Sequence, residues 1–266
     1  METSLELKKF TEVLKEPEYK GRRLISHSEA DNFNQCEQKH YFAHEEKLQP
    51  KKRGDALARG SAGHVYLETF LQAIKDGKSQ ETAEELAIGK AAMLPNAADI
   101  LPKVVFWAKN VWPTLGWKII AVEYEFEPVA VSPTLAVPGK IDLIAEIYDD
   151  KLGWVIAIID HKFLYDPYPQ PVFEMLPQIP KYIGIMRSKG LPVKMGMFNV
   201  IRTRKLNNPM DAYVRVPVYP SNAQIRQQMV EHVNTMKTIE ERHKLNIQPV
   251  RTVNKMNCGH CGFLEL

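Results

Sequence analysis

The stretch GKIDLIAEIYDDKLGWVIAIIDHKF, residues 139–163, contains two apolar segments joined by a short polar one. Each apolar segment has the length of a strand, and Asp149–Gly153 between them has the composition of a hairpin turn. We therefore expect strands at Lys140–Tyr148 and Trp154–Phe163. The second is almost wholly apolar, which is typical of a strand in the middle of a covered sheet.

Two carboxylates interrupt these apolar strands. Asp142 faces away from Leu143 and its alternate neighbours, whereas Asp160 and Lys162 are two residues apart and share a face. If the strands pair as a hairpin, Asp142 and Asp160 converge at one edge of the sheet. Carboxylate oxygens hold Mg²⁺, which polarises a phosphate and lowers the pKa of water, and a nearby lysine offsets developing charge. The alternative is that both aspartates are ordinary polar residues at strand ends.

The rest of the chain predicts an α/β fold with a mixed central β-sheet flanked by helices. Ser26 and Glu29 form a capping box that opens a helix reaching about His44. Pro138-Gly139 is interpreted as a turn, and the first 22 or so residues as a peripheral helix. Further helices are expected at 60–74, 80–112 (interrupted near Pro95 and Pro102), 172–187 and from Ser221 onward, and further strands at 117–129, 193–203 and 211–219.

The composition is that of an ordinary globular protein. The chain has 266 residues, 44% of them hydrophobic, and a net charge of +3, which is a weak indication of a polyanionic partner. No apolar run reaches the roughly 18–20 residues that span a membrane, and the N-terminus lacks an apolar signal core. We expect a cytoplasmic protein in a reducing compartment, nucleoid-associated or phage-encoded forms included, with no membrane partner.

The motifs GKIDLIAE and VIAIIDHKF resemble the paired motifs of the PD-(D/E)XK nuclease superfamily, in which most members carry glutamate where this chain has Asp160. The resemblance implies a restriction-endonuclease-like core over residues 24–266, with residues 1–23 as a peripheral segment and a helical insertion at about 75–115. It also implies a centre that holds Mg²⁺ or Mn²⁺, with His161 counted among the candidate ligands beside Asp142 and Asp160.

Three further marks resemble the RecB-like exonuclease branch, which includes CRISPR-associated and AddB-type nucleases. They are a helical histidine, here His64, a glutamate on the preceding strand, here Glu123 or Glu125, and a glutamine four residues before a tyrosine, here Gln178 and Tyr182. In that branch the histidine is a metal ligand, and the glutamine and tyrosine support the site and the DNA.

These marks also have structural interpretations. His64 lies on one helical stripe with Leu67 and Leu71, so the residues alone favour a buried core histidine. Tyr182 also fits an ordinary packed aromatic. Pro177 directly precedes Gln178, and because proline is tolerated only in a first helical turn, the helix is expected to begin near Pro177.

The chain contains three cysteines, and an odd number argues against a disulfide framework. Cys36, Cys258 and Cys261 resemble three of the four cysteines that hold an iron–sulfur cluster in the related nucleases. The fourth cysteine has no counterpart up to Leu266, and three alternatives follow. The sequence is a truncated form of a protein with a [4Fe-4S] cluster, or the cluster has been lost, or the three cysteines hold zinc together with a histidine such as His260. The segment 257–266 is expected to act as a clip on the N-terminal helix.

The resemblance implies a metal-dependent DNA nuclease, an exonuclease acting on single strands or duplex ends in recombination, repair, replication or phage DNA metabolism. A helicase or recombination protein would be a separate chain. The alternatives are a non-catalytic nuclease-fold protein that binds DNA or a partner, and a zinc-clipped interaction module. The candidate phosphate contacts are Lys51, Lys52, Arg53, Arg202, Arg204 and Lys205.

Overall fold

The computed structural model describes residues 19–50, 54–253, 258–259 and 261–263. The chain divides into two compact units. Unit 1 comprises residues 1–54, 125–139 and 226–266, and unit 2 comprises residues 55–124 and 140–225. Every candidate catalytic residue named above except Glu125 lies in unit 2, whereas the three cysteines lie in unit 1. The expected N-terminal helix lies in residues outside the described ones, and the division at residues 23/24 stays a prediction.

A mixed β-sheet is the central feature of the described chain, as the sequence predicts. Its six strands have the order β1-β3-β4-β5-β6, with β2 pairing beside this path to β3. The pairs β3–β4 and β5–β6 are antiparallel, whereas β4–β5 and β1–β3 are parallel. The strands are β1 (Arg23–Leu24), β2 (Lys118–Ala130), β3 (Leu135–Asp149), β4 (Gly153–Leu164), β5 (Val193–Arg202) and β6 (Tyr213–Val218).

The hairpin between β3 and β4 is confirmed. The carboxylate of Asp149 accepts hydrogen bonds from the backbone N–H groups of Lys151 and Leu152, both 3.0 Å long. Gly153 takes a φ of 71°, which a side chain would disfavour. Strand β4 lies between β3 and β5, which agrees with its almost wholly apolar sequence.

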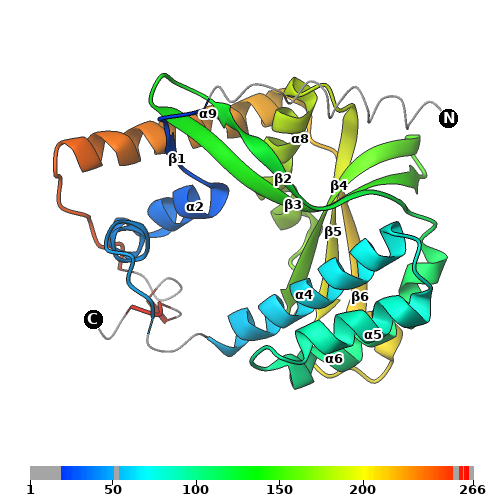
Figure 1. Cartoon of the computed structure of the whole chain (residues 1–266). Helices are drawn as coiled ribbons and strands as arrows, with labels where there is room; N and C mark the ends of the chain where they lie inside the picture. Colours follow the sequence, from blue (N-terminus) through cyan, green and yellow to red (C-terminus); the bar gives the residue numbers. More distant parts are fainter. Residues whose placement is uncertain (1–18, 51–53, 254–257, 260, 264–266) are drawn as a thin grey trace. The chain divides into compact units, whose positions relative to one another are not determined.

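Helices cover both faces of the sheet in unit 2. Figure 1 shows α4, α5 and α6 together on one side of the strands, where they form a continuous core with alternate residues of β3, β4 and β5. On the other face α8 packs against β5 and β4. The elements of this unit include α4 (Asp55–Lys75), α5 (Gln80–Ala91), α6 (Ala97–Phe106), η2 (Trp107–Val111), η3 (Trp112–Thr114), α7 (Gln170–Met175), α8 (Gln178–Ser188) and η4 (Pro209–Ala212).

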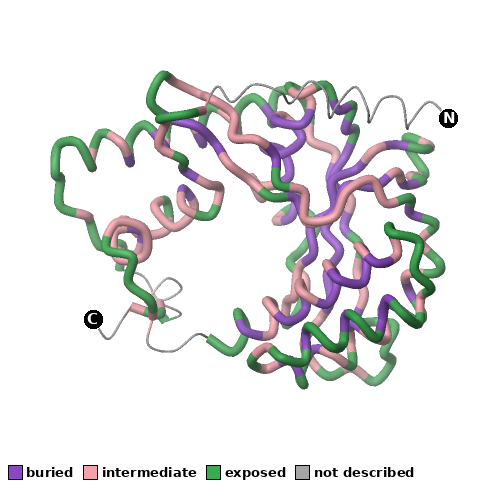
Figure 2. The backbone as a smooth tube through the Cα atoms, viewed as in Figure 1, coloured by how far each residue is buried: buried purple, intermediate pink, exposed green. Residues whose placement is uncertain are grey.

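The two-residue period of β4 sends its side chains to different layers. Ala157 and Ile159 belong to the core with α4–α6, whereas Asp160 and Lys162 lie on the opposite face of the strand. Figure 2 shows the central strands buried along much of their length, while α5 keeps an exposed side. The polar residues of β4 therefore stand out against a buried apolar background.

Some sequence predictions need correction. Pro138-Gly139 is no turn: both residues continue β3, and the chain reverses at residues 131–134, where Ser132 Oγ accepts the N–H of Leu135 at 3.0 Å. Pro102 does not interrupt α6, whose flanking apolar residues are buried in the core. The segment at 172–187 forms two helices, and the second begins after Pro177 as expected.

Unit 1 contains α2 (His27–Gln35), α3 (Glu37–His40), η1 (Tyr41–Glu45) and most of α9 (Asn222–Lys244). Ser26 caps α2 by accepting the N–H of Glu29 at 3.1 Å, which confirms the predicted helix start. The helix ends earlier than predicted, because Cys36 is extended, with φ −169° and ψ 116°. This extended residue separates α2 from α3.

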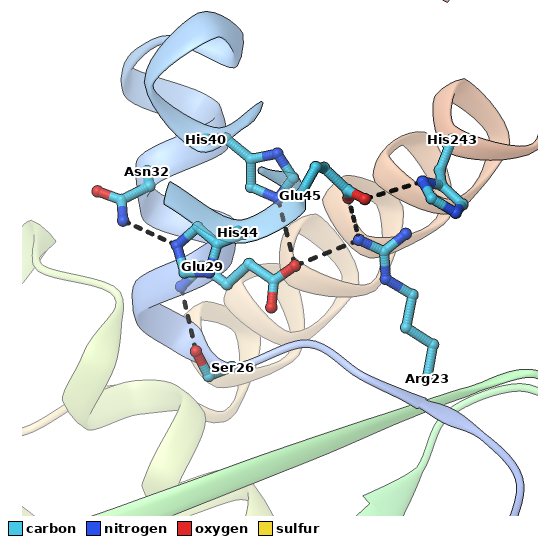
Figure 3. A network of polar contacts seen from close by, with 8 residues as sticks. All are labelled: Arg23, Ser26, Glu29, Asn32, His40, His44, Glu45 and His243. Carbon is cyan, nitrogen blue, oxygen red and sulfur yellow. Dashed lines mark hydrogen bonds and ion pairs between the residues drawn. The ribbon is translucent and has the colours of Figure 1, made fainter. Parts of the chain in front are cut away.

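A polar network joins the elements of unit 1. Figure 3 shows the guanidinium of Arg23 between the carboxylates of Glu29 and Glu45. His40 Nε2 lies 3.2 Å from Glu29, and His243 Nδ1 lies 2.9 Å from Glu45. One network of ion pairs and hydrogen bonds thus links strand β1 with four helical segments.

The close approach of α4 to β4 depends on Gly63, and this yields a test. A Cβ atom at Gly63 would lie 2.3 Å from the ring of Phe163, whereas one at Gly60 on the same helix would meet no atom within 4 Å. We expect Gly63→Ala to lower stability by about 1–3 kcal/mol, because ring or helix must move. Gly60→Ala should raise it by about 0.5–1 kcal/mol through helix propensity.

Thermal melting of the two variants checks this difference. A Gly63→Ala protein that melts at or above the wild-type temperature would contradict the role given to this glycine.

Candidate metal centre

The candidate metal centre lies in unit 2, where strands β3 and β4 separate. Their ladder runs from Asp149 opposite Gly153 to Leu143 opposite Ile159. The next residues are Asp142 on β3 and Asp160 on β4, beyond the last paired positions. A carboxylate oxygen of Asp142 accepts the backbone N–H of His161 at 2.8 Å. This side chain therefore takes the place of a ladder partner and holds the two strands at the point of separation.

Three potential metal ligands from three elements gather beside this point. His64 of α4, Glu123 of β2 and Asp142 of β3 each offer one ligand atom, and these atoms lie within 4.8 Å of one another. The Nδ1 atom of His64 lies 3.6 Å from Oδ2 of Asp142. Among the described residues this is the one such group of histidine, cysteine and acidic side chains. A ring nitrogen with two carboxylate oxygens is a donor set that suits Mn²⁺ or Mg²⁺.

Glu123 has an unusual backbone. Its φ of 47° lies in the left-handed region although it sits within strand β2. For a residue other than glycine this conformation costs about 1–2 kcal/mol, and such strain is common at functional sites. Of the two candidate glutamates, Glu123 belongs to the ligand group, and Glu125 is exposed.

A second set of side chains links β4 to α8. Lys162 Nζ lies 2.8 Å from Oδ2 of Asp160 and donates a hydrogen bond of 3.0 Å to Oε1 of Gln178. Gln178 in turn hydrogen-bonds with Tyr182, whose side chain is buried. Because Gln178 is the first residue of α8, the start of that helix determines where this amide meets the lysine.

Burial and mutual repulsion perturb the acid–base properties of the centre. Burial, followed by the negative charge of Asp160, raises the pKa of Asp142 well above its ordinary value, and the hydrogen bond from His161 opposes this only in part. Burial lowers the pKa of His64, so its imidazole is neutral at pH 7 and has a lone pair for a metal. Burial, then the charges of Asp160 and Asp142, raises the pKa of Tyr182 to about 12.

His161 lies differently from the other candidate ligands. Its side chain is buried, with Nδ1 2.9 Å from the amide nitrogen of Asn199 and its ring 6.4 Å from that of Trp107. Burial lowers its pKa to about 3, so the ring is neutral. It is absent from the ligand group, and its contribution to the centre is the backbone N–H that Asp142 accepts.

The described residues fit a divalent cation. Asp142 keeps only 17% of its side chain exposed and lies close to Asp160, and both conditions destabilise its charged form while no cation is bound. A divalent cation between His64, Glu123 and Asp142 would remove that penalty. Two further neighbours of the centre carry no signal in the sequence. They are Lys140, whose Nζ lies 2.5 Å from Glu123, and Asn199, which contacts His161.

The three cysteines lie around one cavity in unit 1. Cys36, Cys258 and Cys261 line one cavity of about 300 Å³, together with Phe42 and Phe263. All three are free thiols, and within the described residues they form no ligand group as tight as that of His64. Three soft donors around one cavity fit part of a cluster or zinc site, and His260 lies outside the described residues.

The candidate phosphate contacts are only partly described. Arg204 and Arg202 both pair with Asp166, at 2.7 Å and 3.6 Å, so their charges are partly neutralised. Residues 51–53 lie outside the described residues. Across the described part of the chain, no helix combines the length and apolar character that crossing a membrane requires.

The family model of the PD-(D/E)XK nuclease superfamily matches residues 24–266. The chain therefore belongs to this superfamily, as the motifs predicted. No curated protein matches it. Among solved structures, a "Putative exonuclease" from Eubacterium rectale is similar, with a TM-score of 0.52 and 10% identity over 88% of this chain and 85% of that one. The crystal structure of SSO0001 aligns with a TM-score of 0.41 and 15% identity over 100% and 95%.

The raised pKa of Asp142 predicts a conflict between stability and metal binding. The folded protein holds the proton of the Asp142 carboxyl more tightly than the unfolded chain does. The folded state therefore loses stability as pH rises from the pKa of this carboxyl in the unfolded chain, about 3.9, through its higher pKa in the folded protein. Asp142→Asn removes this cost and keeps an oxygen for the His161 N–H. We expect it to raise the melting temperature in EDTA at pH 7.5 by about 2 °C or more.

The same variant should no longer gain stability from Mn²⁺, whereas the wild type should. Melting curves of both proteins with EDTA and with Mn²⁺ measure both effects. A lower melting temperature of Asp142→Asn in EDTA would show that the buried charge is not a burden to the metal-free fold.

Proposed function

We propose that this chain is a metal-dependent deoxyribonuclease that hydrolyses phosphodiester bonds. The observation that carries the proposal is the group of His64, Glu123 and Asp142 beside the Asp160–Lys162 pair, at the point where two strands separate. Membership of a nuclease superfamily supports phosphodiester chemistry and DNA as the substrate. We also propose an intracellular location, where such an enzyme would meet DNA.

Each side chain has a part in this proposal. His64, Glu123 and Asp142 would hold Mg²⁺ or Mn²⁺, and Asp160 would add a carboxylate at its edge. When bound, the cation polarises the phosphate and lowers the pKa of the attacking water. Lys162, which hydrogen-bonds to Gln178, would orient that water or offset charge on the phosphate.

Tyr182 remains protonated at neutral pH, because its pKa is raised to about 12. It therefore supports the site as a neutral hydrogen-bonding group. Its buried ring and its bond with Gln178 connect the orientation of Lys162 to the packing of α8.

Exonuclease action is the more specific proposal. It rests on the RecB-like marks at His64, Gln178 and Tyr182, and it agrees with the name of the neighbour from Eubacterium rectale. Such an enzyme would act on DNA ends in recombination, repair, replication or phage DNA metabolism, beside a separate helicase or recombination protein.

A cleavage assay tests the activity. Wild type is incubated with Mg²⁺ or Mn²⁺ and end-labelled linear DNA, single- and double-stranded, and with circular forms of both. We expect wild type to degrade linear DNA and spare circles, and Asp160→Asn to be slower by about 100-fold or more. Asp150→Asn, in the exposed turn of the same hairpin, should cut as wild type does.

The outcomes separate the alternatives. Cleavage of circles would replace exonuclease with endonuclease action. Loss of all cleavage in wild type would favour a non-catalytic nuclease-fold protein, and full activity of Asp160→Asn would mean that the residues are wrongly assigned.

We also propose that Cys36, Cys258 and Cys261 hold a structural cofactor, an iron–sulfur cluster ahead of zinc. The cavity that the three thiols line supports this proposal. Anaerobically purified protein should show a broad absorption near 400 nm with bound iron and sulfide, and Cys36→Ser should lose it. A colourless protein with stoichiometric zinc would replace the cluster with zinc, and one without either metal would reject the cofactor.

A further inference from the structure

Lys140 makes the shortest ion pair of the candidate metal centre. Its Nζ lies 2.5 Å from Oε2 of Glu123, one of the three residues of the ligand group. Lys140 precedes Asp142 by two residues on β3, so both side chains leave the strand on the same side. Lys140 lies inside the GKID motif but is not one of the residues that carry the family resemblance.

The charges of the metal-free centre explain why Lys140 lies beside Glu123. Three carboxylates lie close together, those of Glu123, Asp142 and Asp160. The negative charges of Asp160 and Glu123 both raise the pKa of Asp142. Two ammonium groups face them, with Lys162 on Asp160 and Lys140 on Glu123. The two lysines thus supply two positive charges against three negative ones while no cation is bound.

The pair of Lys140 and Glu123 is asymmetric. The lysine side chain keeps 44% of its surface exposed, whereas the glutamate keeps 16%. A flexible four-carbon stem can turn its ammonium into water at little cost, but Glu123 is held by a strained backbone beside the other ligands. If the pair opens, Lys140 is therefore the partner that leaves.

We propose that Lys140 is the internal counter-ion of the metal-free centre, and that a divalent cation displaces it from Glu123. The proposal rests on the proposed metal centre. Lys140 stabilises the fold while the site has no metal, and in exchange it weakens metal binding, because each cation must take over a carboxylate that already has a partner. Lys140 acts through Glu123 and is not itself a metal ligand.

A purely structural role predicts the opposite sign. If Lys140 served to hold Glu123 in the orientation that binds metal, removing the ammonium would loosen the ligand and weaken metal binding. The sign of the change in metal affinity therefore distinguishes the two roles.

The test measures Mn²⁺ binding to the full chain without DNA, by electron paramagnetic resonance, in wild type, Lys140→Met and Lys140→Arg. We expect Lys140→Met to bind Mn²⁺ about threefold more tightly or better, because a competing positive charge is gone. Lys140→Arg should stay near wild type. Lys118→Met is the matched control, since Lys118 pairs with Glu146 across β2 and β3 at 2.7 Å, outside the ligand group.

Melting in EDTA adds a second readout. Lys140→Met should melt below wild type without metal and gain more from Mn²⁺, whereas Lys118→Met should leave the gain unchanged. Equal or weaker Mn²⁺ binding by Lys140→Met would overturn the proposal.

Wild-type protein gives an independent measurement if Lys140→Met does not fold. Reductive methylation with isotopic formaldehyde, quantified by mass spectrometry, reports how readily each lysine amine reacts. Mn²⁺ should accelerate labelling of Lys140 and leave Lys118 unchanged, and an unchanged rate at Lys140 would overturn the proposal. If wild type binds no Mn²⁺ at all, the metal centre itself fails, which is a different result from a Lys140 that does not compete.

Discussion

The hydrogen bond from the His161 N–H to the carboxylate of Asp142 is the interaction on which the centre depends. A β-ladder normally satisfies backbone groups with other backbone groups. Here the ladder ends at Leu143 and Ile159, and a side chain satisfies the next donor. The strands can therefore part within a buried sheet without leaving that N–H unpaired, and the gap brings Asp142 and Asp160 together.

This arrangement has an energetic cost that the surrounding layers sustain. Carboxylates taken out of water beside one another repel, and the raised pKa of Asp142 records that cost. A core shared by α4–α6 and the sheet holds one side, and α8 holds the other. Gly63 lets α4 come close enough to bring His64 to the same point, and the left-handed backbone of Glu123 brings the third ligand. A rigid frame thus keeps charges together that would separate in a loose one.

The chain shows how far sequences can diverge around one fold. It belongs to the PD-(D/E)XK nuclease superfamily, and a solved structure that aligns over 88% of its length shares only 10% identity with it. Buried apolar positions of a sheet accept many residues of the right size, whereas a metal ligand or a lysine beside it accepts few.

By itself, the sequence was sufficient for the β3–β4 hairpin, the central place of β4, the mixed sheet, the start of α8 and the superfamily, because each follows from local periodicity, turn residues or a short motif. The predictions of a turn at Pro138-Gly139 and of an interrupted helix at Pro102 were wrong, because tertiary packing continues a strand and a helix through residues that usually end them. Only the tertiary structure chose Glu123 over Glu125 for the ligand group, turned the ring of His161 toward Asn199 and placed Lys140 on Glu123. These outcomes depend on one strained residue and on contacts between distant segments, which no local pattern encodes.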